Sequence, residues 1–244
     1  MIKSPLLRLL TGVAAVALVL VGLVIATTRT GKPDAPAEKE VVHSITGALD
    51  GRQAATLEVI TGAESVIIHS EPMEGYLYRA STLPGSRVEP AAAVDGDVVR
   101  LSLNGTEIAG QATVHVYLNS TVRWHLKLAG GGLRQVVDFA SGRLAGVDVV
   151  AGVQELEVTV PKPEGELPIR VGGVGKLLVH APAGPPAQLT LGESSTVGKA
   201  TLDASAKQNL AGGTVLALPG WQQAADRYSL RVDGGAAEVL LDRR

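Results

Sequence analysis

Histidine has the widest chemical range among the side chains of this sequence, because imidazole can act as an acid, a base or a metal ligand near neutral pH. The five histidines are His43, His69, His115, His125 and His180. His115 and His125 lack the glutamate and the second histidine that a helical zinc site places at fixed spacing. His69 and His180 are 111 residues apart; we expect this to be about five turns of the repeat described below, or roughly 25 Å, too far for a shared metal ion. We therefore predict surface or strand-edge positions for the histidines, and no metal site.

Paired carboxylates are the second candidates. Asp95 and Asp97, like Glu155 and Glu157, are two residues apart and so share one face of an extended strand. Such a pair could bind Ca²⁺ or act in acid–base catalysis, but a strand with one face in water exposes charges at this spacing in any case. The charged positions of the repeat change type from copy to copy, so we expect no column of equal charge like that of a polysaccharide-cleaving β-helix enzyme.

Nucleophilic catalysis has no sequence support. The chain contains no cysteine, which excludes a thiolate nucleophile, a disulfide and a Cys-ligated metal, and it contains no G-x-S-x-G motif. We predict no catalytic, metal or cofactor-binding residue, no cofactor and no enzymatic activity.

The composition limits the class of ligand. Of the 244 residues 45% are hydrophobic, yet only 3% are aromatic, and the chain has 29 Gly and 13 Pro. Few aromatic rings disfavour sugar clefts, base-stacking platforms and peptide grooves. The balance of 22 basic and 24 acidic residues makes a nucleic-acid partner unexpected.

The N-terminal sequence predicts a membrane anchor. Residues 1–8 form a short tail with Lys3 and Arg8, and residues 9–26 are almost entirely apolar, long enough for about 27 Å of helix. The two cations favour a cytoplasmic tail. A cleaved signal peptide is the alternative, but the end of the apolar run matches a small-x-small cleavage site poorly; a buried core helix is a third. Residues 27–42 mix Pro, Gly and charge and predict a linker, which leaves residues 43–244 as an extracytoplasmic domain.

A repeat runs through that domain. Apolar residues follow Gly152 at the first, fourth and sixth positions, and the same offsets recur after Gly62, Gly173 and Gly235. Weaker copies begin at Gly110, Gly132 and Gly212. The clear neighbours are 20 or 21 residues apart, and the 62 residues from Gly173 to Gly235 equal about three steps.

This period predicts an all-β fold, a single-stranded β-helix (β-solenoid) with rungs of roughly 20 residues. The glycines would form its corners and the small aliphatic residues its thin core. We expect residues 43–60 and 238–244 to cover the two ends, and edge pairing could produce a homo-oligomer. The alternative is a β-sandwich whose turns recur by chance.

Three segments carry a resemblance to a known family: residues 122–132, 158–166 and 169–174. They resemble the toast-rack or adhesin-like β-solenoid domains of bacterial envelope proteins, and are similar to the C-terminal domain of the cell-wall-active antibiotic response proteins. The similarity is best over residues 120–182. It implies a β-helix on a bacterial envelope and transfers no catalytic residue. The single predicted span differs from the several spans of the antibiotic-response proteins.

These observations predict a single-pass protein of the bacterial cell membrane, with a cytoplasmic N-terminus, that presents a β-solenoid as a structural, adhesin-like or sensory binding module. Its partners would be the membrane, through residues 9–26, and an envelope polymer or a membrane protein. The alternatives are a glycan-active β-helix enzyme and an accessory regulator of a membrane signalling partner.

Overall fold

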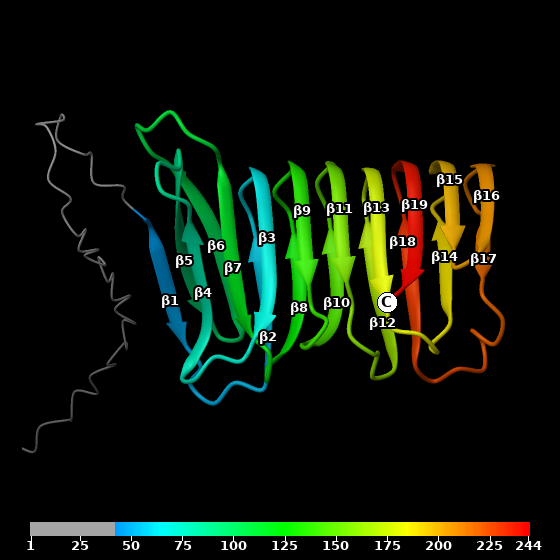
Figure 1. Cartoon of the computed structure of the whole chain (residues 1–244), viewed down its shortest axis with the longest axis horizontal. Coiled ribbons are helices and arrows are strands. Elements are labelled where there is room, and N and C mark those ends of the chain that lie inside the picture. Colours follow the sequence, from blue (N-terminus) through cyan, green and yellow to red (C-terminus); the bar gives the residue numbers. More distant parts are fainter. Residues whose placement is uncertain (1–41) are drawn as a thin grey trace, which may run out of the picture.

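Two β-sheets face each other along the whole length of the computed structural model, which describes residues 42–244 (Figure 1). Sheet A contains ten strands: β1 (Ser44–Ala48), β3 (Ala63–Glu71), β4 (Tyr76–Thr82), β7 (Thr113–Asn119), β9 (Gly132–Asp138), β11 (Val153–Thr159), β13 (Val174–Ala181), β15 (Thr196–Leu202), β16 (Ser205–Leu210) and β19 (Gly235–Arg243). Sheet B contains nine: β2 (Ala54–Val59), β5 (Val88–Asp95), β6 (Val98–Gly105), β8 (Arg123–Leu128), β10 (Arg143–Val149), β12 (Glu166–Val171), β14 (Ala187–Leu191), β17 (Val215–Ala217) and β18 (Arg227–Val232).

The described residues contain strands and turns but no helix, so the prediction of an all-β fold is confirmed for them. None of them forms a helix that could cross a membrane. The predicted tail, transmembrane helix and all but the last residue of the linker lie outside the described residues.

In the middle of the molecule the chain alternates between the sheets. From β8 to β13 each strand is followed by one in the opposite sheet, and each return places the new strand parallel to the one before it in its own sheet. We call each such pair, one strand of sheet B and the following strand of sheet A, a rung. Gly132, Val153 and Val174 are in register, which confirms a period of about 21 residues here.

Antiparallel strands complete both ends, so the sheets are mixed. At the N-terminal end β4 pairs antiparallel with β1 and β7, and β5 pairs with β6; at the other end β16 pairs with β15, and β17 with β14. The predicted uniform stack of parallel strands is therefore limited to the middle of the molecule.

Two rungs lie out of chain order. The β2–β3 rung stands between the β6–β7 and β8–β9 rungs, and the β18–β19 rung stands between the β12–β13 and β14–β15 rungs. Figure 1 shows the second insertion as red strands between yellow and orange ones. The expected three steps from Gly173 to Gly235 are thus wrong, because the strands that follow these glycines are direct neighbours.

The insertions also change what covers the ends. Residues 238–243 lie inside sheet A, as part of β19, and Arg244 follows them, so residues 238–244 do not cover the C-terminal end; β16 and β17 form that end instead. Of residues 43–60, β1 lies at the edge of sheet A as expected, whereas β2 is an interior strand of sheet B.

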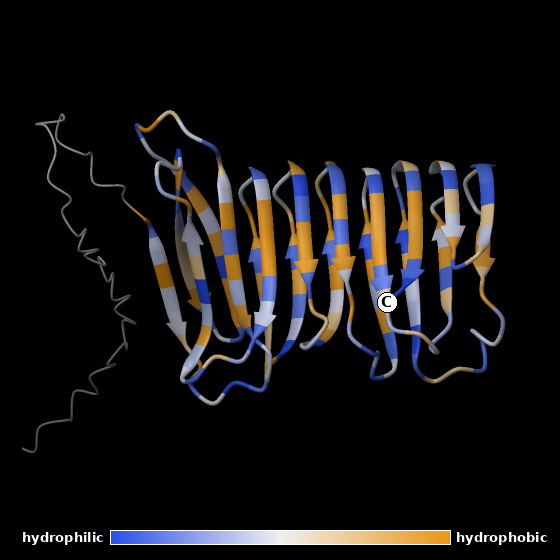
Figure 2. Cartoon of the chain, in the orientation of Figure 1, coloured by the Kyte–Doolittle hydropathy of each residue, from blue (hydrophilic) through white to orange (hydrophobic). Residues whose placement is uncertain are grey.

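The core is a set of aliphatic rows. Val66, Leu156, Leu177 and Val239 share one register position on β3, β11, β13 and β19, with exposures of 0–2%. Figure 2 shows the hydrophobic residues alternating with hydrophilic ones along the strands. Because the sheets are close, ladders of Val, Leu and Ile fill the space between them, which explains the small number of aromatic residues.

The repeat begins one residue earlier than expected in β9. Gly132 pairs with Ala63 and Val153, so Gly131 is the corner equivalent to Gly62 and Gly152. Gln135 therefore takes a core position. A Cβ on Gly62 would lie 2.6 Å from the Gly131 carbonyl oxygen, so close backbone approach is what requires glycine there.

The other two weaker copies differ from each other. The copy at Gly110 keeps the register, since its Val114 pairs with Val66. The copy at Gly212 is wrong, because its apolar residues belong to the antiparallel β17 and the turn after it. A further copy begins at Thr196, which pairs with Gly235; because no glycine stands at this position, the glycine-based repeat does not reveal it.

Candidate functional site

One register row on the outward side of sheet A contains two of the histidines, together with two aspartates. The row contains His69, Asp138, Thr159, His180 and Asp242, on β3, β9, β11, β13 and β19. His69 and His180 are therefore three strand steps apart, about 14 Å, rather than five. The error arises because the copy at Gly110, which precedes β7, lies on the far side of β3.

His180 joins three strands. It is 3% exposed, its Nδ1 lies 2.6 Å from Asp242 Oδ1 on β19, and its Nε2 lies 3.4 Å from Glu157 Oε1 on β11. The Nε2 atom makes no hydrogen bond of good geometry. Since the carboxylates are on opposite ring nitrogens, the arrangement links strands and does not surround a common point. No group of three or more metal-ligating side chains occurs within residues 42–244.

A ring cluster lies nearer the N-terminal end of the same face. The His69 and Tyr117 rings stack with centroids 5.6 Å apart, and His115 stacks on both at 6.5 Å. The Arg79 guanidinium lies 4.4 Å from the Tyr117 ring centroid. Burial and the neighbouring His69 lower the pKa of His115. Sequence spacing missed this cluster because about fifty residues separate β3 from β7 along the chain.

Each of the remaining histidines contacts one carboxylate. His125 Nε2 lies 2.8 Å from Asp148 Oδ2 on the neighbouring β10, and His43 Nδ1 lies 3.3 Å from Glu89 Oε2. Both are partly exposed. Their positions agree with the expected surface roles, and neither faces a second imidazole.

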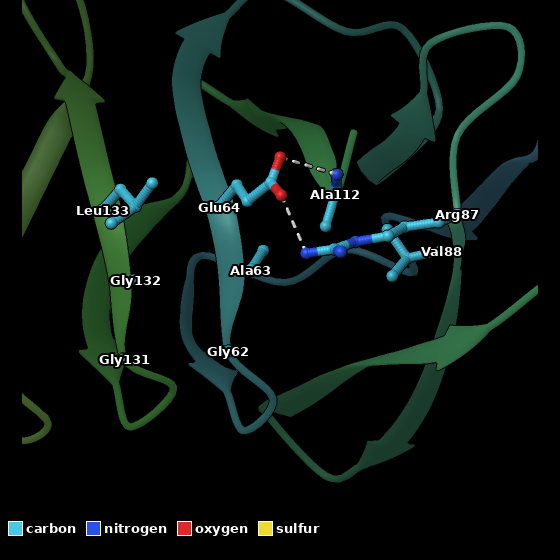
Figure 3. Close-up of a pocket in the computed structure, with 9 residues that line it drawn as sticks. All are labelled: Gly62, Ala63, Glu64, Arg87, Val88, Ala112, Gly131, Gly132 and Leu133. Carbon is cyan, nitrogen blue, oxygen red and sulfur yellow. Dashed lines mark hydrogen bonds and ion pairs between the residues drawn. The ribbon is translucent and has the colours of Figure 1, made fainter. Parts of the chain in front are cut away.

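A hollow of about 360 Å³ opens at one corner of the molecule (Figure 3). Glu64 projects into it from β3 and accepts two contacts: Arg87 Nη2 lies 2.8 Å from Oε1, and the Ala112 amide donates to Oε2 at 3.2 Å. Figure 3 shows that these partners come from other segments of the chain. Glu64 and Arg87 are the titratable residues of this lining, and each engages the other, so the hollow offers no acid–base pair for catalysis.

Both outward faces carry a row of charges that alternate in sign. On sheet A, successive strands from β9 to β15 present Arg134, Glu155, Lys176, Glu238 and Lys199 at one register position. On sheet B, successive strands from β6 to β12 present Arg100, Glu58, Lys127, Asp148 and Arg170. We call these rows the charge ladders. The absence of a column of equal charge was expected, but the regular alternation was not.

The ladders mark the inserted rungs. Glu238 of β19 lies between Lys176 and Lys199, with oxygen–nitrogen distances of 3.8 and 3.3 Å. Glu58 of β2 lies between Arg100 and Lys127 in the same way, at 3.2 and 3.1 Å. Without its inserted strand, each site would place two cations side by side, which destabilises a sheet. The hydrogen bond from Lys127 and the charges of both cations lower the pKa of the Glu58 carboxyl.

No family model and no curated protein matches the chain. Among solved structures, the chain is similar to a candidate cell adhesion protein from Clostridium sporogenes, with 14% identity, a TM-score of 0.60, and coverage of 83% of this chain and 99% of that one. Matches to candidate adhesins from Bacteroides fragilis and Parabacteroides distasonis have identities of 8% and 10% and TM-scores of 0.31 and 0.26. They cover 85% and 83% of this chain and 98% of each of those chains. The first similarity shows that this chain shares the fold of the Clostridium protein.

Proposed function

We propose that this protein is a single-pass membrane protein of the bacterial envelope that presents an adhesin-like β-solenoid as a binding module. The observation that carries the proposal is the fold shared with the candidate cell adhesion protein over nearly the whole of that chain. The toast-rack resemblance of residues 122–132, 158–166 and 169–174 is consistent with it and stays a prediction.

The form of the surface supports binding of a large partner. The outward faces of the two sheets are long, strand-based and charged, and the hollows along them are lined by short segments of neighbouring strands. A small-molecule site is normally a concave, mostly apolar cleft with a few convergent polar groups. The hollow around Glu64 has its polar groups engaged with each other instead.

The proposed location is the bacterial cell membrane. Residues 9–26 would span the membrane, residues 1–8 would stay in the cytoplasm, and residues 27–42 would connect the span to the domain of residues 43–244 outside. The partner would be an envelope polymer or a membrane protein, and not a nucleic acid. The edge strands β16 and β17 could pair with a second copy.

The proposal is tested with the full chain and isolated envelope material. Purified chain in an uncharged detergent is mixed with lipid-free envelope fragments and centrifuged. We expect the chain to sediment with the fragments without releasing soluble sugars. A chain that stays in the supernatant would overturn the binding module, and release of sugars would support the glycan-active alternative.

Topology is tested in cells. An epitope placed after Arg244 should be cut by protease added to spheroplasts whose cytoplasmic membrane is intact. Protection of the epitope would overturn the proposed orientation.

A further inference from the structure

The outward faces of the two sheets differ in charge over the same four rungs, β8–β9, β10–β11, β12–β13 and β18–β19. On sheet B the outward positions carry six cations and two acids, an excess of four positive charges; they are Arg123, Lys127, Arg143, Arg170, Arg227, Arg231, Asp148 and Glu166. On sheet A they carry two cations and five acids, an excess of three negative charges; they are Arg134, Lys176, Asp138, Glu155, Glu157, Glu238 and Asp242.

The positive excess is local, because the whole chain has a net charge of −2. The rim of the sheet B face adds the cation Lys162 and the acids Glu164, Asp226 and Asp233, so an excess of two remains. We call the outward face of β8, β10, β12 and β18 the basic face.

The basic face contains two pairs of like charges. Arg123 and Arg143 are register partners on β8 and β10, and Arg170 and Arg231 are register partners on β12 and β18. Like charges at directly adjacent positions destabilise a sheet. In the described part of the chain, no carboxylate lies within ion-pairing distance of Arg123 or Lys162. An anion from outside the chain would relieve this repulsion.

On the basic face Lys127, Arg143, Arg227 and Arg231 each have a nitrogen within 3.2 Å of a carboxylate oxygen, so Arg123 and Arg170 are the cations least satisfied within the chain. On the opposite face every acid has a partner, although an excess of three negative charges remains. Glu155 and Glu157 lie 3.2 and 3.0 Å from Arg134 nitrogens, Glu238 lies between two lysines, and Asp138 and Asp242 each approach a histidine. On the basic face, Arg170 has only a 3.4 Å contact with Asp148, which also binds His125 at 2.8 Å.

A hollow gives the basic face depth. It has a volume of about 390 Å³ and is lined by the cations Lys127 and Arg170 and the acids Asp148 and Asp233, with aliphatic and glycine residues between them. The outward positions of the four strands include no Phe, Tyr or Trp. Recognition there would therefore depend on charge and not on stacking of neutral sugar rings.

We propose that the basic face binds a linear anionic polymer, with phosphate or carboxylate groups, that runs across the strands. The cations recur on strands about 4.8 Å apart, so a chain with regularly spaced charges meets several of them at once. The inference rests on the proposed function, since it names the ligand class of the binding module. The competing occupant is the acidic face of a second copy. This occupant is disfavoured because the acids of sheet A already have partners within their own chain.

The test uses the full chain in an uncharged detergent and measures its affinity by fluorescence anisotropy. The probes are long-chain inorganic polyphosphate, poly-L-glutamate and, as the neutral control, dextran. The two anionic probes distinguish phosphate from carboxylate recognition. We expect binding of at least one of them that weakens as salt concentration rises, and no binding of dextran.

Matched variants locate the site. Arg123→Gln with Arg170→Gln removes one member of each like-charge pair, and should weaken binding about tenfold, at roughly threefold per lost contact. The control variant, Arg134→Gln with Lys176→Gln, removes two positive charges from sheet A and should change the affinity less than twofold. The first variant should also keep its melting temperature, because it removes repulsion.

Three outcomes would overturn the proposal. The first is the absence of salt-dependent binding to either polyanion. The second is equal weakening of binding by both variants. The third is self-association of the chain that both variants abolish, which would assign the faces to a second copy. If the basic-face variant still sediments with envelope fragments as the unchanged chain does, the binding module stands and the assignment to this face fails.

Discussion

Glu238 offers the sharpest test of the charge ladders, because it lies on an inserted strand between two lysines. Its carboxylate oxygens are 3.3 Å from Lys199 Nζ and 3.8 Å from Lys176 Nζ, and its side chain is 33% exposed. We predict that Glu238→Gln destabilises the domain modestly and that Glu238→Lys does so about twice as much.

The magnitudes follow from the exposure of the three side chains. A partly exposed ion pair contributes about 0.5 kcal/mol, so glutamine at this position would cost about 1 kcal/mol for the two pairs. Lysine would add repulsion from both neighbours at about 0.5 kcal/mol each, for a total of about 2 kcal/mol. In a domain of this size these losses correspond to falls in melting temperature of about 2–4 °C and about 4–8 °C.

Thermal melts of the full chain, followed by circular dichroism, measure the effect at low and at high salt. Because the Debye length falls to about 3 Å at 1 M salt, most of the difference between the two variants should disappear there. Glu107→Lys makes the same charge change on an exposed loop residue with no ion pair in the described part of the chain. Equal melting temperatures for Glu238→Lys and Glu107→Lys, or a difference that salt leaves intact, would refute the reasoning.

Three further predictions concern single residues. Because its pKa is lowered, Glu58 should stabilise the fold above its ordinary pKa and lose this effect as the pH falls through the lowered value; the melting-temperature difference from Glu58→Gln should therefore shrink in acid. Gly62→Ala places a Cβ 2.6 Å from a backbone oxygen and should cost about 1–3 kcal/mol, whereas Gly152→Ala meets no atom within 4 Å and should leave the thermal melt nearly unchanged. Burial raises the pKa of Tyr228 to about 12, and its hydroxyl donates to the Pro161 carbonyl at 3.0 Å. Stability from this neutral phenol should persist up to about pH 10 and be lost as the pH rises through 12; Tyr228→Phe should cost about 1 kcal/mol at neutral pH, and an ultraviolet pH titration should show the late ionisation.

The period and the strand content were predictable because both follow from side-chain alternation. The spacing of Val153, Leu156 and Val158 marks an inward face in each strand where the same spacing recurs. The observed register of β9, β11 and β13 is the one that this spacing predicts, apart from the one-residue shift at Gly131. That shift was hidden because Gln135 occupies a core position, where apolar spacing alone does not place a polar residue.

The order of the rungs was not predictable from period alone. A gap of 62 residues between Gly173 and Gly235 fits three rungs stacked in chain order. It fits equally well a chain that folds back, so that the strand after Gly235 pairs directly with the strand after Gly173. The information that separates these arrangements is in the outward charges: Lys176 and Lys199 are both cationic, and Glu238 fits between them. The ring cluster of Tyr117, like the basic face, depends on the same long-range order.

The position of β18 and β19 also bears on when the domain can be complete. These strands are synthesised after β14 to β17, yet in both sheets they are the hydrogen-bonded link between the β12–β13 rung and the strands β14 to β17. A chain that ended before Arg227 would therefore not merely fray at one end. Residues 187–217 would lose all strand pairing to the rest of the domain and leave two sheet edges open in the middle of the molecule. The two sheets can therefore be completed only after β18 and β19 have been synthesised.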